Sequence, residues 1–283
     1  MKKILALILA IIMTMSLLAA CGAEEPKNEA TQAPTEATEA TGEATEGTEE
    51  AATFKTIEEG KLIMSTNAEF PPYEMTDDSG NYIGIDVEIA TAIAEKLGLE
   101  LEILDIAFDA ALLAVNEGKS DIVMAGVTVN EDRKLVMEFT ESYASGVQVV
   151  IVKEGSDVTM DNLGEKMIGT QRGTTGDIYA SDTPENGGYG EDHVTSYENG
   201  ATAVQALING QVDCVIIDSA PAAEYVKANA GLAILEGEWV VENYAIGCDK
   251  GNTALVEAIN EVLVELINDG TVQSIIDKYI TAE

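Results

Sequence analysis

An arginine at the end of a polar segment is the first candidate for chemistry in this sequence. Gly126–Arg133 reads GVTVNEDR and follows Asp121–Ala125 (DIVMA), a short apolar run whose branched residues predict a buried strand. Open α/β sheets bind ligands where strands end in polar turns, and an arginine there can hold a carboxylate through two parallel hydrogen bonds. The alternative is a surface ion pair of Arg133 with Glu131 or Asp132.

Two more groups of polar residues follow predicted strands. Gln171–Gly176 (QRGTTG) is a turn from a strand into a helix, where free N–H groups favour an anion. Asp218 ends a buried apolar run, so its carboxylate needs a partner such as an ammonium group. The alternatives are structural, because Thr128, Thr174, Thr175 and Asp218 can also cap turns or helices.

Hydrophobic periodicity places these turns in two β/α units. Strands alternating with helices predict mostly parallel sheets, and two units with facing strand ends enclose a cleft. Strands are predicted at residues 61–66, 99–104, 121–125, 147–152, 163–170, 193–197, 211–217, 232–235 and 244–247, and helices at 85–97, 108–116, 177–180, 200–208, 220–228, 255–267 and 272–279.

The links between the two units are less regular. Residues 138–145 are predicted to be irregular. Short segments with lysine and glycine follow two extended stretches, at Lys153–Gly155 and Lys250–Gly251. We predict that they mark two crossings between the units.

Composition excludes several classes of function. The net charge of −36 argues against a nucleic-acid partner, because phosphate binding needs clustered lysine and arginine. Motifs for zinc hydrolases, phosphate loops and serine nucleophiles are absent, and Asp77–Asn81 (DDSGN) lacks the ligand spacing of a calcium loop. The single histidine, His193, is expected at the surface. We therefore expect no cofactor, no metal and no catalysis.

The N-terminus predicts export. Met1–Lys3 is basic, Ile4–Ala20 is almost entirely apolar, and small residues precede Cys21, as in a secretory signal. Leu18–Cys21 (LAAC) resembles the lipobox of bacterial lipoproteins. That resemblance implies removal of residues 1–20 and a lipid on Cys21 that holds the protein at the outer face of the cell membrane. An uncleaved transmembrane anchor is the alternative.

The following segment and the remaining cysteines differ in character. Residues 21–53 are rich in Thr, Glu, Ala and Gly without large apolar residues, which predicts a disordered acidic tether. Cys214 and Cys248 are predicted to be buried or unpaired thiols, with a disulfide between them as the alternative.

From about Lys61 to Tyr279, the order of motifs resembles the extracytoplasmic polar-amino-acid-binding proteins of ABC importers. The resemblance rests on NAEFPPYE, YIGIDVEIATAIAEKLG, FDAALLAVNEGKSDIVMAGVTVNEDR, IGTQRGTTGD and NDGTVQSIIDKY in sequence. It implies a two-lobed α/β fold of the type II periplasmic-binding-protein kind, with two hinge crossings. Residues 54–152 with 244–283 would form the first lobe, and 153–243 the second.

The resemblance also implies a function. The protein would be a monomeric, lipid-anchored receptor that binds a free L-amino acid in the cleft between the lobes and delivers it to the permease of an ABC importer. Two alternatives remain open, namely a sensory adapter that reports an amino acid to a membrane receptor and a dehydratase-like enzyme on the same fold.

Roles for single residues follow from the resemblance. Arg133 would hold the ligand α-carboxylate, Asp218 its ammonium group, and Phe70 and Phe108 its side chain, although both aromatics could be plain core residues. Thr128, the backbone at Ala125 and Gly126, and the amides at Thr174 and Thr175 would complete the contacts. The predicted ligand-binding set is Asn67, Phe70, Phe108, Ala125, Gly126, Thr128, Arg133, Gln171, Thr174, Thr175 and Asp218.

Four residues bear on ligand selectivity. Asn67 stands where relatives that select cationic or glutamine side chains often carry aspartate, and Glu69 would compensate if it points inward. Gly176 leaves space where relatives often have a larger polar residue, and Arg172 faces either an acidic ligand side chain or solvent. This pattern favours an uncharged polar amino acid.

Overall fold

The computed structural model describes residues 54–280, in which strands and helices alternate. The predicted signal peptide (1–20), lipid site (Cys21) and tether (21–53) lie outside these residues and stay predictions. Within residues 54–280, no helix is both long enough and apolar enough to cross a membrane.

The observed elements follow the predicted order closely. The strands are β1 (Lys61–Thr66), β2 (Glu69–Phe70), β3 (Glu74–Thr76), β4 (Tyr82–Ile83), β5 (Glu100–Asp105), β6 (Ile122–Val123), β7 (Met137–Lys153), β8 (Ile168–Gln171), β9 (Val194–Tyr197), β10 (Cys214–Asp218), β11 (Leu232–Ile234) and β12 (Val240–Asp249). The helices are α1 (Ile85–Lys96), α2 (Phe108–Asn116), α3 (Glu131–Val136), α4 (Thr175–Ser181), α5 (Gly200–Ile208), α6 (Ser219–Ala228), α7 (Thr253–Asn268) and α8 (Thr271–Tyr279), with short 3-10 helices η1 (Met160–Glu165), η2 (Pro184–Asn186) and η3 (Glu191–His193).

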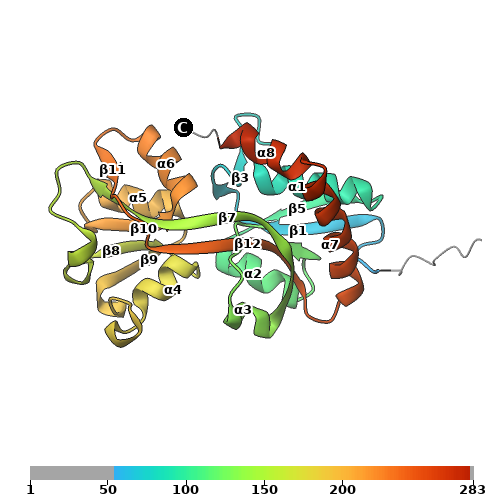
Figure 1. The fold of residues 1–283 in the computed structure, drawn as a ribbon, viewed down its shortest axis with the longest axis horizontal. Helices are drawn as coiled ribbons and strands as arrows, with labels where there is room; N and C mark the ends of the chain where they lie inside the picture. Colours follow the sequence, from blue (N-terminus) through green and yellow to red (C-terminus); the bar gives the residue numbers. More distant parts are fainter. Residues whose placement is uncertain (1–53, 281–283) are drawn as a thin grey trace, which may run out of the picture. The chain divides into compact units, whose positions relative to one another are not determined.

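The fold has two lobes joined by two long strands. In the first lobe β5, β1 and β6 run parallel, and in the second lobe β10, β8 and β9 run parallel. Strands β7 and β12 pair antiparallel with each other and link the two lobes. All these strands form one nine-stranded sheet, in which eight strands follow the order β5-β1-β6-β12-β7-β10-β8-β9 and β11 pairs with β7. Helices cover both faces of each lobe (Figure 1).

Two expectations about the links were wrong. Residues 138–145 are not irregular, because they belong to the 17-residue strand β7. The lysine-glycine pairs end β7 and β12 instead of marking the crossings, since β7 already pairs with β10 from Gln148 to Val152. The crossings are the paired segments Ala144–Gln148 and Val240–Tyr244. The division at residues 152/153 and 243/244 stays a prediction.

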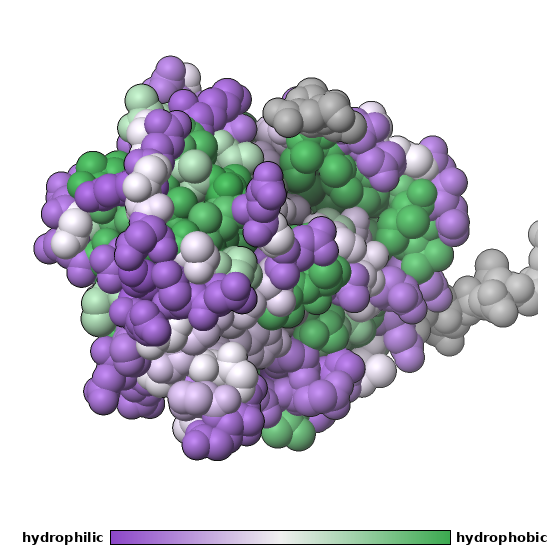
Figure 2. Space-filling model, turned by 60° about the vertical axis from the view of Figure 1, so that its left-hand side comes forward, coloured by the Kyte–Doolittle hydropathy of each residue, from purple (hydrophilic) through white to green (hydrophobic). Residues whose placement is uncertain are grey.

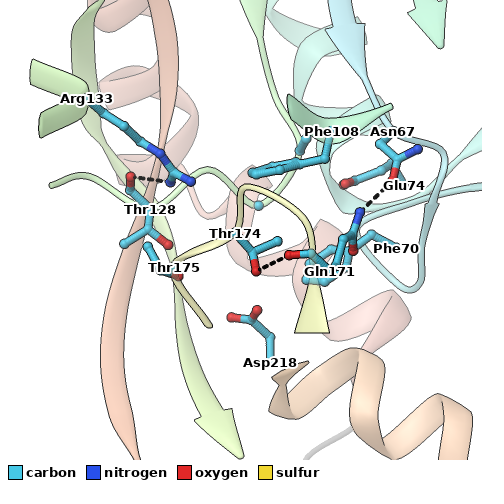
Figure 3. Close-up of a pocket in the computed structure, with 12 residues that line it drawn as sticks. Asn67, Phe70, Glu74, Phe108, Thr128, Arg133, Gln171, Thr174, Thr175 and Asp218 are labelled. Carbon is cyan, nitrogen blue, oxygen red and sulfur yellow. Dashed lines mark hydrogen bonds between the residues drawn. The ribbon is translucent and has the colours of Figure 1, made fainter. Parts of the chain in front are cut away.

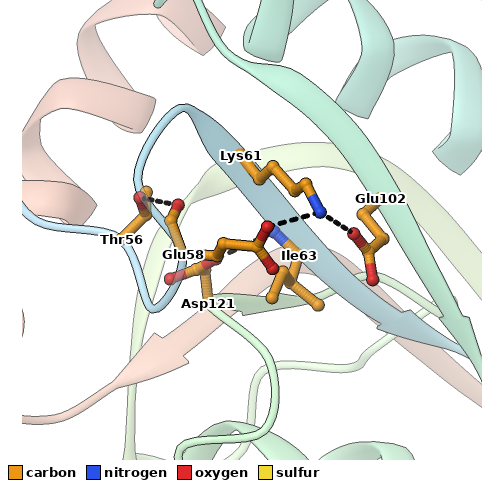
Figure 4. Close-up of polar contacts among 6 residues, drawn as sticks. All are labelled: Thr56, Glu58, Lys61, Ile63, Glu102 and Asp121. Atoms are coloured by element: carbon orange, nitrogen blue, oxygen red, sulfur yellow. Dashed lines mark hydrogen bonds and ion pairs between the residues drawn. The ribbon is translucent and has the colours of Figure 1, made fainter.

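The N-terminal end of β1 is fixed by a buried aspartate and an ion pair (Figure 4). The Asp121 carboxylate accepts hydrogen bonds from the backbone N–H groups of Ile57 (2.7 Å) and Ile63 (2.8 Å). Lys61 Nζ lies 2.6 Å from Glu58 and 2.9 Å from Glu102. These contacts hold residues 57 and 58 beside β1 and join β1 to β5.

Both cysteines of the folded part are free and buried, as predicted. Cys214 lies on β10 and Cys248 on β12, each with no solvent exposure. Burial raises the pKa of both thiols to about 12, so neither is a reactive thiolate near neutral pH.

Figure 2 shows one face of the molecule, where hydrophilic residues surround separate apolar areas. The hydrophilic residues of this face agree with the acidic composition.

Helix α1 starts at a glycine that no other residue can replace easily. Gly84 has φ 131°, and a Cβ atom there would lie 2.2 Å from the carbonyl oxygen of Tyr73. The Tyr73 carbonyl also accepts a hydrogen bond from Asp86 N–H at 2.9 Å, so the backbone cannot move away freely.

We expect Gly84→Ala to lower the free energy of unfolding by about 3 kcal/mol, through an unfavourable φ and a backbone clash. Gly60→Ala is the matched control, because Gly60 also has a positive φ, of 80°, but open space around it. It should cost about 1 kcal/mol. Urea denaturation of both variants measures the difference, and equal losses would contradict this role of Gly84.

Candidate functional site

One pocket between the lobes collects all the predicted site residues. Its cavity volume is about 20 Å³, so the two lobes lie close together around it. Arg133 and Thr128 lie on one side, Asn67, Phe70 and Glu74 on the other, and Asp218 at the end of β10 (Figure 3). The lining residues are the eleven predicted ones, Asn67, Phe70, Phe108, Ala125, Gly126, Thr128, Arg133, Gln171, Thr174, Thr175 and Asp218, together with Glu74. That they bind a ligand stays a prediction.

Arg133 is buried and makes no ion pair with Glu131 or Asp132, so the surface alternative is wrong. Only 7% of its surface is exposed, and its guanidinium donates to the carbonyl oxygens of Thr128 (2.8 Å) and Gly173 (3.2 Å). These acceptors are neutral. Burial lowers the pKa of Arg133 from its usual value. The guanidinium group stays charged, because its usual pKa lies far above neutral pH. A positive charge without a directly bonded carboxylate therefore faces the pocket.

A helix cap and an aromatic ring fix the position of Arg133. Asn130 precedes α3, and its side-chain oxygen accepts a hydrogen bond from Arg133 N–H at 2.8 Å. The guanidinium carbon lies 5.6 Å from the centre of the Phe108 ring, within the range of a cation–π contact. Phe108 therefore packs against the arginine as well as lining the pocket. Asn130 was missed, although an asparagine before an acidic helix start is a recognisable capping signal.

In the second lobe, the turn before α4 is organised by Asp177. Its carboxylate accepts hydrogen bonds from Thr170 Oγ1 (2.6 Å), Ser196 Oγ (2.5 Å) and Gly173 N–H (3.0 Å). Thr174 caps α4, because its hydroxyl oxygen accepts from Asp177 N–H at 3.2 Å. The structural alternative is thus correct for Thr174, which also lines the pocket. The helix starts at Thr175, where N–H groups have no partner within the helix.

Asp218 is not a helix cap in the way its position suggested. It precedes α6 without a capping hydrogen bond. Instead its carboxylate accepts from Gln148 Nε2 at 2.8 Å and from the hydroxyl of Tyr244. Burial raises the pKa of Asp218 to about 7, although both hydrogen bonds oppose this shift. A cationic group bound beside Asp218 would favour the ionised form.

Direct contacts join the two lobes across the pocket. Gln171 Nε2 donates to Asn67 Oδ1 at 2.9 Å, and Arg133 reaches Gly173. At the edge, Asn199 Nδ2 donates to Glu69 Oε2 at 2.8 Å. Since Asn67 already accepts from Gln171, its amide serves a contact between the lobes.

Glu74 lines the pocket but is not among the predicted ligand-binding residues. It closes the NAEFPPYE motif, and its side chain lines the pocket with 1% of its surface exposed. No N–H group and no hydroxyl group of the described residues donates to either of its carboxyl oxygens. Burial, together with the charge of Asp86 and a hydrogen bond shared with its carboxyl group, raises the pKa of Glu74 well above its usual value. A buried carboxyl group that faces a pocket and has only another carboxyl group as its partner is suited to a ligand that brings donors.

Asp86 stands behind Glu74 and supports the opposite wall. It is fully buried and accepts a hydrogen bond from Gly126 N–H at 2.9 Å. Burial raises the pKa of Asp86 to about 6, although the hydrogen bond from Gly126 opposes this shift. Asp86 thereby holds the turn that leads to Thr128.

The other residues considered for selectivity, Glu69, Arg172 and Gly176, do not line the pocket. Glu69 points outward to Asn199, and Arg172 is exposed to solvent. A Cβ atom on Gly176 would lie 2.8 Å from Gln148 Oε1, so the space there is already occupied by Gln148. Among residues 54–280, no group of three or more His, Cys, Asp or Glu side chains is arranged to hold a metal ion.

The pocket thus offers one guanidinium, helix-start N–H groups and two buried carboxyl groups at separate places, which suits a ligand carrying both a negative and a positive charge.

The family model for bacterial extracellular solute-binding proteins, family 3, matches residues 62–282. A probable histidine-binding protein of Neisseria gonorrhoeae is 34% identical over 225 residues, covering 78% of this chain and 83% of the relative. The arginine-binding extracellular protein ArtP of Bacillus subtilis is 28% identical, covering 79% and 87%.

Solved structures agree with these relatives. The arginine-binding protein of T. maritima, in a mutant crystal structure, has a TM-score of 0.73 at 36% identity and covers 79% of this chain and 96% of its own. The arginine-, lysine- and histidine-binding protein ArtJ of Geobacillus stearothermophilus has the same TM-score at 32% identity and the same coverage. The chain is therefore a member of family 3 of the bacterial extracellular solute-binding proteins, amino-acid-binding components of ABC transporters with a two-lobed type II fold.

Proposed function

We propose that this protein is a lipid-anchored extracytoplasmic receptor that binds one free amino acid in the pocket between its lobes and delivers it to an ABC importer. The single observation that carries the proposal is the placement of Arg133 and Asp218 in one pocket. A free amino acid has a carboxylate and an ammonium group on the same carbon atom. Arg133 with the start of α4 suits the former, and Asp218 suits the latter.

The charge balance supports an amino acid with a cationic side chain. The pocket is lined by one guanidinium, that of Arg133, and by the buried carboxyl groups of Glu74 and Asp218. Two more buried carboxyl groups, those of Asp86 and Glu242, lie behind it and bond to the lining residues Gly126 and Thr128. A ligand with a guanidinium, ammonium or imidazolium group would add a positive charge beside Glu74, where no donor now reaches the carboxyl oxygens. We therefore replace the expected uncharged polar ligand with a basic one. The relatives whose names specify arginine, lysine or histidine fit this choice.

Closure of the two lobes would complete the site. Arg133, Thr128 and Glu74 come from the first lobe, whereas Thr174, Thr175 and Asp218 come from the second. A ligand that contacts both lobes stabilises the closed form by its higher affinity for that form. An importer that recognises the closed form would then receive loaded protein. The lipobox sequence and the family membership support this location and partner.

The test of the proposed function is a thermal-shift screen of the chain against the twenty amino acids. We expect L-arginine, L-lysine or L-histidine to raise the melting temperature by several degrees, because binding to the native state stabilises it by mass action. Arg133→Gln should weaken binding at least a hundredfold, about 3 kcal/mol, by removing the charge that meets the carboxylate. No shift with any amino acid would overturn the proposal.

The Glu74→Gln variant tests whether the bound amino acid has a basic side chain. It should weaken calorimetric binding of the basic ligand by about tenfold or more, since a charged partner becomes neutral, and change glutamine binding by less than about threefold. The matched control is Glu261→Gln, because Glu261 is exposed on α7 away from the pocket and its change should leave both affinities unchanged. If Glu74→Gln and Glu261→Gln behave alike, Glu74 does not select the ligand.

Lipid attachment has a separate test. In a bacterium fed labelled palmitate, we expect the full chain to incorporate the label and Cys21→Ser to lose it, because the acyl chains are carried by that thiol. Cys214→Ser is the matched control, since its thiol is buried and inert. Equal labelling of the Cys21→Ser variant and the full chain would contradict the lipoprotein assignment.

A further inference from the structure

Two buried polar residues lie behind the pocket, on the strands that join the lobes. Gln148 on β7 and Glu242 on β12 have 1% and 4% of their surface exposed, and neither lines the pocket. Both lie in the crossing segments, where β7 and β12 pair. A buried carboxylate at such a place is costly unless its hydrogen bonds are used.

These two residues form a continuous chain of hydrogen bonds between two pocket residues. Thr128 Oγ1 donates to Glu242 Oε2 at 3.0 Å, and Gln148 Nε2 donates to the same oxygen at 3.0 Å. Gln148 Nε2 also donates to Asp218 Oδ2 at 2.8 Å. The chain therefore runs from Thr128 in the first lobe to Asp218 in the second through the joining strands.

The direction of the donors has a chemical consequence. A threonine hydroxyl has one proton and two lone pairs, and Glu242 takes the proton of Thr128. Toward the pocket, Thr128 can then only accept a hydrogen bond. Gln148 uses both amide protons, one on Glu242 and one on Asp218, and so holds the Asp218 carboxylate in place.

We propose that Glu242 and Gln148 are positioning residues that make Thr128 and Asp218 a paired acceptor site for the ligand ammonium group. A ligand carboxylate is disfavoured there, because the Thr128 oxygen presents only lone pairs and the ionised Asp218 carboxylate repels it. The chain also makes the ammonium site depend on closure, since Thr128 and Asp218 belong to different lobes. This inference rests on the proposed function and specifies how the same pocket orients an amino acid.

Small residues keep the room that this arrangement needs. Gly146 lies on β7 next to Tyr244, and a Cβ atom there would lie 2.7 Å from Asp218 Oδ1 and closer still to the Tyr244 hydroxyl. A Cβ atom on Gly176 would meet Gln148 Oε1 at 2.8 Å. The Tyr244 hydroxyl is thus able to reach Asp218 from the side opposite Gln148.

A double-mutant cycle tests the role of Glu242. The purified full chain is titrated calorimetrically with L-arginine, or with whichever amino acid the screen shows it to bind. Glu242→Gln keeps the shape but can donate to Thr128, which reverses the hydroxyl. It should weaken binding about tenfold in the native background and less than about twofold beside Thr128→Val, where no hydroxyl remains. Equal losses in both backgrounds would overturn the proposal.

A second comparison tests Gln148 by changing the ligand. Deaminoarginine keeps the carboxylate and the guanidinium but lacks the α-ammonium group. Gln148→Met should weaken L-arginine about tenfold and deaminoarginine less than about twofold, because only the former uses the paired acceptors. Equal losses for both ligands would show a merely structural role and overturn the proposal for Gln148.

Matched controls separate this proposal from the proposed function and from misfolding. Glu261→Gln and Gln205→Met make the same chemical changes at exposed positions and should leave both affinities unchanged. Melting temperatures of the ligand-free variants report on folding. If the native chain binds no amino acid, the proposed function fails. If it binds but the ratios above do not change, only the present inference fails.

Discussion

The antiparallel pairing of β7 with β12 is the constraint on which the rest of the molecule depends. These strands complete the sheet of each lobe, so neither lobe has a full set of strands without them. They also carry Gln148, Glu242 and Tyr244, which contact Asp218 or Thr128. The element that joins the lobes is therefore part of the wall behind the pocket. A change in the angle between the lobes must alter the surroundings of the residues proposed to hold the ligand.

The pocket and the residues behind it contain more acidic than basic side chains. Carboxyl groups outnumber the single guanidinium around it, and burial raises the pKa of Glu74, Asp86 and Asp218. A raised pKa means that the ionised form is disfavoured, and a cation bound beside such a carboxyl group favours its ionisation. Binding energy of this kind is largest for ligands whose positive charges lie beside the most deeply buried carboxyl groups. Selectivity then follows from where a positive charge is placed within the pocket.

Much of the fold could be predicted from the sequence, because the hydrophobic periodicity of each segment matches the helix or strand that it forms. Helix α2 has the predicted bounds, and α1, α5, α6 and α8 differ by a residue at most. The failure at β7 has a physical cause. Residues 138–145 include Thr140, Ser142 and Ser145, which read as irregular, whereas pairing with β12 over this stretch holds them extended. Eleven of the twelve residues that line the pocket were predicted through motifs. Glu74 was not, although it lies in one of those motifs, and neither were Gln148 and Glu242, since burial of a polar residue is set by partners far away in sequence.

The inert cysteines have a practical consequence. Because Cys214 and Cys248 are buried and do not form a disulfide, the folded part does not depend on oxidation for its stability. A chain in which Cys21 is replaced would present no reactive thiol from residues 54–280. Single cysteines introduced on the surface of each lobe could then be labelled selectively with a pair of fluorophores. The motion of the lobes would become an optical signal, and the molecule a sensor for its own ligand in living cultures.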